Sequence, residues 1–131
     1  MAVYQSADQL YNVMQQLVTA IETQYPQATE AMLKSKLVIR FICRQPDGEM
    51  VVDARKRPLQ IHYGTSLVKP QLDIHLDADT LHQILLGELN LIKALGSKKV
   101  EPKGPIFKAI SLAPLFEQAQ SVYPEILAAS H

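Results

Sequence analysis

Histidine and aspartate side chains in the middle of the chain are the first candidates for chemistry. Asp53, His62, Asp73 and His75 alternate with apolar residues, so they should gather on the polar face of a predicted sheet. Carboxylates and imidazoles on one face permit acid–base catalysis and, with His82, a metal site. The histidines lack the dense spacing of a metal motif, however, and polar residues are ordinary on an exposed strand face. We therefore predict a solvated surface with no catalytic residues and no metal.

No nucleophile or phosphate-binding motif takes the place of these residues. The segment YGTSLV at 63–68 does not match the glycine-flanked serine turn of hydrolases, and the chain has no glycine loop that could cradle a phosphate. The single cysteine, Cys43, cannot form an internal disulfide, and it lies on the apolar side of a predicted strand, where a buried and inert thiol is expected. We predict a protein that is not an enzyme and needs no cofactor.

Positive charge is concentrated in one short span of a neutral chain. The protein has 13 lysines and arginines against 13 aspartates and glutamates, so we predict no nucleic-acid partner and at most transient contact with a membrane surface. Within the span, Glu101 is the only acidic residue. The five lysines are Lys93, Lys98, Lys99, Lys103 and Lys108. They form either a solvated face or a contact for acidic headgroups or a partner protein.

The length of 131 residues predicts one domain, with helices in 1–34 and a sheet with covering helices in 36–131. Ser6 with Gln9 is a capping-box pattern ahead of an apolar stripe, and Pro26 starts a second, shorter helix. The first residues contain neither a basic leader nor a long apolar run. We therefore expect no signal peptide or membrane span, and a cytoplasmic location.

The spacing of apolar residues changes to every second position after residue 36. It predicts four half-buried strands around residues 37–43, 50–54, 59–63 and 72–76. The Pro-Asp-Gly sequence at 46–48 favours a turn that joins the first two into an antiparallel hairpin. The sheet should then have one polar and one apolar face.

Two short apolar helices are predicted next, each ended by a glycine. Asp77 can cap the first, which ends at Gly87, and the second covers residues 88–95 before Gly96. Helices this short are stable only when they pack against other elements.

An edge strand containing Pro102 follows, and then a helix that begins at Pro105 and is divided at Pro114. Helices before and after an antiparallel sheet indicate an α+β fold with its helices on the apolar face. Taken alone, the apolar helices indicate core packing rather than a ligand cavity.

The segment QLDIHLDADTLHQILLGELNLIKALGSKKVEPKGPIFKAISLAPLF at 71–116 resembles the sterol carrier protein type-2 family in the order of its elements, and the upstream hairpin LVIRFICRQPDGEMVVD fits the same pattern. The resemblance implies a five-stranded, mostly antiparallel sheet and an apolar tunnel, between sheet and helices, that accepts fatty acyl chains, sterols or other lipids. Pro102 and the Gly104-Pro105 pair depart from the family's pattern. This departure predicts a short fifth strand and a differently hinged final helix.

The same resemblance implies, by position, ten apolar residues that form the wall and lid of the tunnel. These candidates are Phe41, Ile84, Leu85, Leu89, Ile92, Leu95, Phe107, Ile110, Leu115 and Phe116. A lysine at the mouth could orient an anionic headgroup. The implied function is non-enzymatic binding or transfer of a fatty acyl, sterol-like or isoprenoid chain, and similar bacterial domains are accessory lipid binders in isoprenoid-quinone biosynthesis.

A different function is compatible with the same fold. With a filled core and no ligand, the domain would be an interaction or dimerisation module that uses the lysines or exposed helices. Energetics distinguish the two, because a dry cavity of ~300 Å³ costs about 7 kcal/mol, comparable to the whole stability of a small domain. A tunnel must therefore collapse or be occupied, and each methylene inserted returns about 0.8 kcal/mol.

Overall fold

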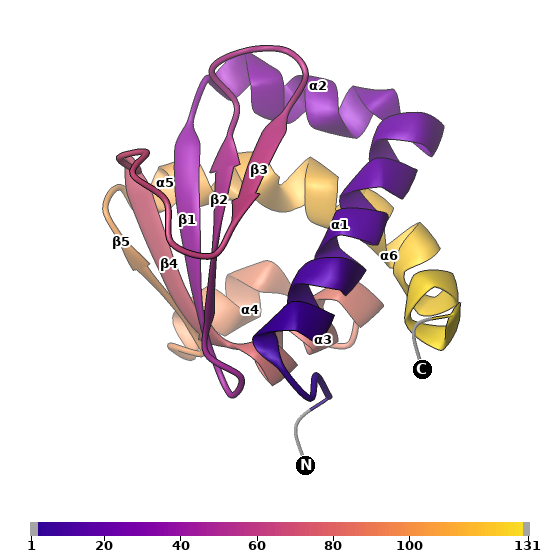
Figure 1. The fold of residues 1–131 in the computed structure, drawn as a ribbon. Coiled ribbons are helices and arrows are strands. Elements are labelled where there is room, and N and C mark those ends of the chain that lie inside the picture. Colours follow the sequence, from indigo (N-terminus) through magenta and orange to yellow (C-terminus); the bar gives the residue numbers. More distant parts are fainter. Residues whose placement is uncertain (1–2, 130–131) are drawn as a thin grey trace.

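The computed structural model describes residues 3–129 and has a sheet with all of its helices on one side (Figure 1). The sheet is formed by β1 (Val38–Arg44), β2 (Gly48–Asp53), β3 (Gln60–Tyr63), β4 (Leu72–Asp77) and β5 (Val100–Lys103), in the order β3-β2-β1-β4-β5. Only the central β1–β4 pair is parallel. The predicted α+β fold with a five-stranded, mostly antiparallel sheet is therefore confirmed.

Register in the sheet follows the alternation of apolar residues. Phe41 at the centre of β1 pairs with Met50 on β2 and with Ile74 on β4, and the buried side chains of all three face the helices. The fifth strand has four residues, and Pro102 lies opposite Ile74 at the edge, where a residue without an N–H costs no ladder hydrogen bond. The short edge strand was correctly predicted.

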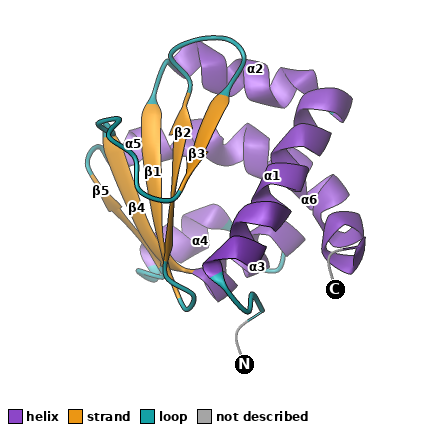
Figure 2. Ribbon diagram, viewed as in Figure 1, coloured by secondary structure: helices purple, strands orange, loops and turns teal. Residues whose placement is uncertain are grey.

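The connection between β3 and β4 must cross the sheet, because β2 and β1 lie between these two strands (Figure 2). This segment, residues 64–71, passes over the face opposite the helices. Val51 points to that face and is nevertheless fully buried. The polar face of the sheet is consequently less open than alternation alone predicts.

Two helices precede the sheet, α1 (Ala7–Gln24) and α2 (Pro26–Ser35). The Ser6 hydroxyl accepts a hydrogen bond from the Gln9 amide at 3.1 Å, which confirms the predicted helix start. The Gln9 side chain accepts from the Gln5 amide at 2.6 Å rather than from Ser6, so the reciprocal half of the capping box is shifted by one residue.

Two short helices, α3 (Ala78–Leu86) and α4 (Leu91–Gly96), follow β4. Asp77 occupies the N-cap position of α3, but its carboxylate pairs with Arg44 at 3.1 Å instead of capping the helix. Gly87 ends α3 in the left-handed conformation, with φ of 80°, as predicted.

The predicted boundaries of α4 were wrong at both ends. Asn90 caps the helix, because its side-chain oxygen accepts from the amides of Ile92 and Lys93 at 2.8 and 3.3 Å, and the helix therefore starts after residue 88. Gly96 belongs to the helix, and the left-handed residue is Lys98, with φ of 64°.

The last part of the chain is divided as Pro114 predicts. A short α5 (Ile106–Ala109) leads through a 3₁₀ turn, η1 (Ile110–Leu112), into α6 (Ala113–Ala129). Pro114 is the second residue of α6, where its missing N–H is tolerated. The long α6 carries Phe116 near its start and packs against α1, α2 and α3.

A buried polar cluster joins α6 to the N-terminal segment and to α3. The Tyr123 hydroxyl contacts the Tyr4 hydroxyl and lies 2.6 Å from Nδ1 of His82. Burial raises the pKa of Tyr123 to about 12 and raises that of Tyr4 as well. Nearby, the amide of Val3 donates to Asp79 at 2.9 Å. The cluster joins residues that are 119 positions apart and sets where α6 crosses α3.

Candidate functional site

The histidines and aspartates singled out for chemistry do not converge. His62 on β3 and His75 on β4 are separated by β2 and β1, which places them roughly 14 Å apart at the usual strand spacing. Asp73 accepts two hydrogen bonds of 2.8 Å from the Arg40 guanidinium. His82 belongs to the tyrosine cluster described above. Within residues 3–129, no three His, Cys, Asp or Glu side chains are grouped as metal ligands.

The remaining aspartate is also held by an arginine. Asp53 contacts the Arg55 guanidinium at 2.7 Å, and this hydrogen-bonded pairing lowers the pKa of the Asp53 carboxyl. A carboxylate that is ionised and saturated with donors is a poor general acid or base. The surface of the sheet therefore offers no assembled acid–base pair among the described residues.

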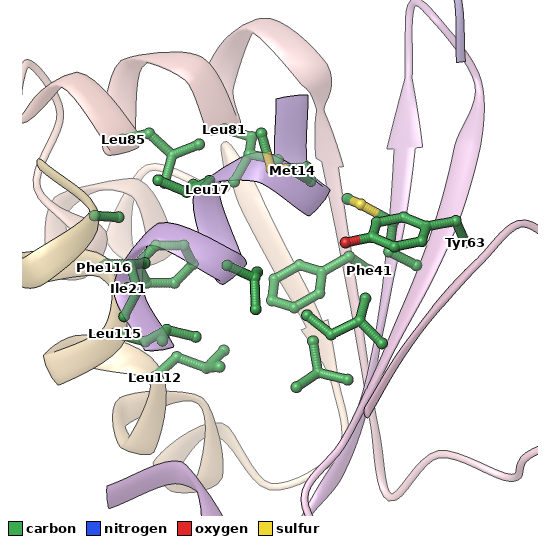
Figure 3. A pocket seen from close by; sticks show the side chains of 15 residues that line it. Met14, Leu17, Ile21, Phe41, Tyr63, Leu81, Leu85, Leu112, Leu115 and Phe116 are labelled. Carbon is green, nitrogen blue, oxygen red and sulfur yellow. The ribbon is translucent and has the colours of Figure 1, made fainter. Parts of the chain in front are cut away.

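An apolar cavity of about 70 Å³ lies on the other face of the sheet, where the sheet meets α1, α3 and α6 (Figure 3). Fifteen residues line it, and no polar atom contributes to its surface. Phe41 projects from β1 into the middle of the group and faces Phe116 of α6, with ring centroids 6.5 Å apart and planes at 90°. The lining of the cavity therefore favours uncharged, apolar groups over charged ones.

Tyr63 is the cavity residue with a polar end. Its ring packs against Tyr11 at 5.7 Å, and burial raises the pKa of its hydroxyl to about 12, so the group is neutral at physiological pH. An ionised group would lose its hydration here without gaining a partner. Any charged headgroup must therefore stay outside the cavity.

The predicted wall residues fall into three groups. Phe41, Leu85, Leu115 and Phe116 line the cavity. Ile84, Ile92 and Ile110 line a second space, a groove of about 170 Å³ between α4, η1 and α6, which Phe116 also borders. Leu89 and Leu95 pack against the core, and Phe107 is exposed. Between residues 3 and 129 we find a cavity and a groove that share Phe116, and not an open tunnel. Their role in lipid binding stays a prediction.

Eleven of the fifteen residues that line the cavity were not named as wall residues from the sequence. Eight of the eleven come from α1 and from the β2–β3 hairpin, among them Met14, Leu17, Ile21, Met50 and Ile61, and the other three are Leu81, Leu112 and Ala119. The signal was present, since α1 carries one apolar stripe and both strands alternate. What the stripe covers depends on packing with residues far away in the sequence.

The lysines surround the β5 edge of the molecule. Lys93 lies on α4, Lys98 and Lys99 join α4 to β5, Lys103 ends β5, and Lys108 lies on α5. All except Lys108 are exposed. In the part of the chain that the structure describes, Lys93, Lys98, Lys99 and Lys103 form no ion pair, whereas each of the four arginines pairs with a carboxylate.

Cys43 should be inert toward thiol reagents in the folded protein. Its side chain is buried beneath the helices, and burial raises the pKa of the thiol to about 12, so almost no thiolate is present near neutral pH. We expect maleimide labelling of the native protein to be about a hundredfold or more slower than labelling in denaturant. Mass spectrometry of timed samples measures this, with Cys43→Ser as the blank. Equal rates in the two states would contradict the structure.

Among residues 3–129, no helix is both long and apolar enough to cross a membrane. The comparison with protein families then settles the relationship of the chain. The model of the SCP-2 sterol transfer family matches residues 18–117. The chain belongs to this family. SCP-2 domains are generally lipid-binding and non-catalytic, and membership supports lipid binding or transfer as the function of this one. No curated protein is significantly similar in sequence.

Solved structures of SCP-2 domains have the same fold. The sterol carrier protein domain 2 of Helicoverpa armigera matches with a TM-score of 0.68 at 23% identity, over 86% of this chain and 89% of that one. Palmitated SCP2L2 from Aedes aegypti matches at 0.61 and 17%, over 79% and 90%. A ubiquinone synthesis protein, UbiJ-SCP2, matches at 0.59 and 16%, over 78% and 86%.

Proposed function

We propose that this SCP-2 domain binds a fatty acyl, sterol-like or isoprenoid chain in the cavity between the sheet and helices α1, α3 and α6, and releases it without chemical change. The observation that carries the proposal is the cavity itself, whose surface is entirely apolar. The palmitated state of the Aedes aegypti structure supports an acyl chain as one class of ligand.

The small size of the cavity fits a conformation in which the helices lie close to the sheet. At ~24 cal/mol per Å³, a void of 70 Å³ costs about 2 kcal/mol, whereas an open tunnel of ~300 Å³ would cost about 7 kcal/mol. A domain of ordinary stability can carry the first cost but not the second. The helices therefore close on the empty site, and a ligand must displace them to enter.

The element placed to move is the α5–η1–α6 segment. Phe116 separates the cavity from the outer groove and borders both, so a shift of the start of α6 joins the two spaces. The 3₁₀ turn that precedes Pro114 has weaker hydrogen bonding than an α-helix, which makes it the natural hinge. In this proposal Phe116 is the gate, and it moves when the chain bends at η1.

A hydrophobic biosynthetic intermediate is a suitable cargo. Contacts with apolar walls scale with buried area and discriminate weakly between chains, so the site should accept several long-chain molecules. The similarity to a ubiquinone synthesis protein favours an accessory role in isoprenoid-quinone metabolism among the possible settings.

The alternative function, an interaction module without ligand, is favoured by one specific observation. The cavity is smaller than the ~150 Å³ that holds a benzene molecule in an engineered protein. If the helices cannot move apart, the interior is effectively a filled core. The domain would then act only through its surface.

Native mass spectrometry of freshly purified protein, followed by lipid analysis of a denatured extract, tests the proposal. We expect a bound mass of several hundred daltons that is lost on denaturation and is recovered when a long-chain fatty acid is added. A fluorescent fatty acid should bind at the same site. A protein that leaves the cell empty and also fails to take up the probe would refute lipid binding and leave the interaction module.

A further inference from the structure

Large apolar side chains are exposed in an unusual concentration around the gate. Four such residues are strongly exposed within residues 3–129, and three of them lie on α4, α5 and η1: Ile92 at 59%, Phe107 at 71% and Ile110 at 49%. The fourth, Leu67, is fully exposed on the loop that crosses the opposite side of the sheet. Single exposed apolar residues are common, but a cluster indicates a surface that is covered in function.

The three residues form one surface. Phe107 and Ile110 are three positions apart in a continuous helical turn, so their side chains lie on the same side of it. Ile92 reaches the same place from α4, because Ile92 and Ile110 line the two sides of the outer groove. We call Ile92, Phe107 and Ile110 the apolar rim.

Positively charged side chains surround the apolar rim. Lys93 follows Ile92 directly, and Lys103 ends the strand that leads into α5. Neither forms an ion pair within the described part of the chain, and the same holds for Lys98 and Lys99 between them. Residues 88–117 contain five lysines and three glutamates, in a protein whose total charge is zero. One of those glutamates, Glu117, lines the groove itself.

We propose that the apolar rim and its lysines dock on the surface of an anionic lipid bilayer. Phe107, Ile92 and Ile110 enter the boundary between headgroups and acyl chains, while the lysines contact anionic headgroups in the same plane. A soluble partner would bury an equivalent apolar area, but the excess of lysines over glutamates in residues 88–117 matches the negative charge of such a membrane.

Docking at this surface places the gate of the lipid site against the bilayer, and in that respect the inference rests on the proposed function. Phe116 lines both the groove below the apolar rim and the cavity. A chain that moves from the bilayer along the apolar side of the groove, formed by Ile84, Ile92 and Ile110, stays partly shielded from water until it reaches the cavity. It thereby avoids full transfer through water, in which every exposed methylene is unfavourable.

Co-sedimentation with lipid vesicles tests the docking surface. We expect the full chain to bind phosphatidylcholine vesicles that contain about one fifth phosphatidylglycerol about tenfold more strongly than pure phosphatidylcholine vesicles. Binding should weaken when salt is raised from about 0.1 to about 0.5 M. The double variant Phe107→Ser with Ile92→Ser should lower binding about tenfold, with an unchanged circular dichroism spectrum.

Matched controls separate this surface from the rest of the molecule. Leu67→Ser removes the other exposed apolar residue and should leave binding unchanged, and Lys56→Gln, on the exposed turn before β3, should do the same. Lys93→Gln with Lys99→Gln should weaken binding to the anionic vesicles alone. An equal loss in the Leu67→Ser control, or equal binding to both kinds of vesicle, would overturn the proposal.

Two further results separate the docking surface from its alternatives. Sedimentation velocity that shows a dimer lost in the Phe107→Ser variant, without vesicle binding by the wild type, would make the apolar rim an interface between copies and refute membrane docking. A protein that carries lipid in native mass spectrometry but ignores vesicles likewise refutes docking, while the proposed function stands. Vesicle binding by a protein that takes up no lipid supports docking and refutes the cavity proposal.

Discussion

Replacing Ala119 by leucine should strongly weaken lipid uptake while the protein stays folded. Ala119 is buried on α6, one helical turn after Phe116, and its methyl group forms part of the cavity wall. The three additional carbon atoms of leucine occupy space that a bound chain needs in the proposed mechanism. We expect the dissociation constant for a fluorescent fatty acid to rise about tenfold or more, equivalent to at least ~1.4 kcal/mol.

The stability of the Ala119→Leu variant should change little. Burial of additional methyl groups in an existing void is favourable by about 0.8 kcal/mol each, and overpacking costs typically 1–3 kcal/mol, so the two effects offset each other within about 1.5 kcal/mol. Denaturant unfolding of the empty protein measures this directly. The loss of binding can then be attributed to filled space and not to a damaged fold.

Ala128→Leu is the matched control for this prediction. It makes the same chemical change on the same helix at an exposed position, away from the cavity. Its affinity for the probe should equal that of the wild type. If Ala119→Leu binds the probe as well as Ala128→Leu does, the ligand site lies elsewhere.

Most elements of the fold follow from local sequence signals, and the errors lie where a signal was weak or a second one competed. Ser6, Gly87 and Pro114 mark helix boundaries that the structure confirms. The start of α4 was misplaced because Leu89 continues the apolar spacing across Asn90, and the capping side chain was not recognised as stronger evidence.

The cavity depends on information that no local pattern contains. The contribution of α1 follows from its crossing of α6, and the Tyr4–Tyr123 contact that helps to position α6 joins the two ends of the chain. Its volume depends on how far the helices stand from the sheet, which is decided by the simultaneous packing of many side chains. Alternation could predict that Phe41 faces inward, but not how much space remains beside it.

A small cavity and a lipid-binding function are compatible if closure and stability are coupled. In the proposed mechanism, the edge-to-face contact between Phe41 and Phe116 closes the site, and a chain that enters must break this contact. The free energy of binding is thus the gain from burying the ligand minus the cost of separating the two rings. Removal of one ring should change both the stability of the protein without ligand and the stabilisation that ligand provides.

Phe41→Ala should therefore destabilise the empty protein strongly and make it depend on ligand. Phe41 is almost fully buried at the centre of the sheet, and loss of such a ring typically costs 3–5 kcal/mol of the roughly 5–15 kcal/mol that stabilise a domain. A bound acyl chain can fill the enlarged space and recover about 0.8 kcal/mol for each methylene that lies there. A saturating fatty acid should raise the unfolding midpoint of Phe41→Ala more than that of the wild type.

Leu76→Ala controls for the loss of buried apolar surface itself. Leu76 is also buried on the same face of the sheet but does not line the cavity, so its removal should cost about 2–5 kcal/mol without increasing the response to ligand. Unfolding in urea with and without a fatty acid, for the wild type and both variants, gives the comparison. If ligand stabilises Leu76→Ala as much as Phe41→Ala, the fatty acid stabilises the fold without occupying the space beside Phe41, and the cavity is not its site.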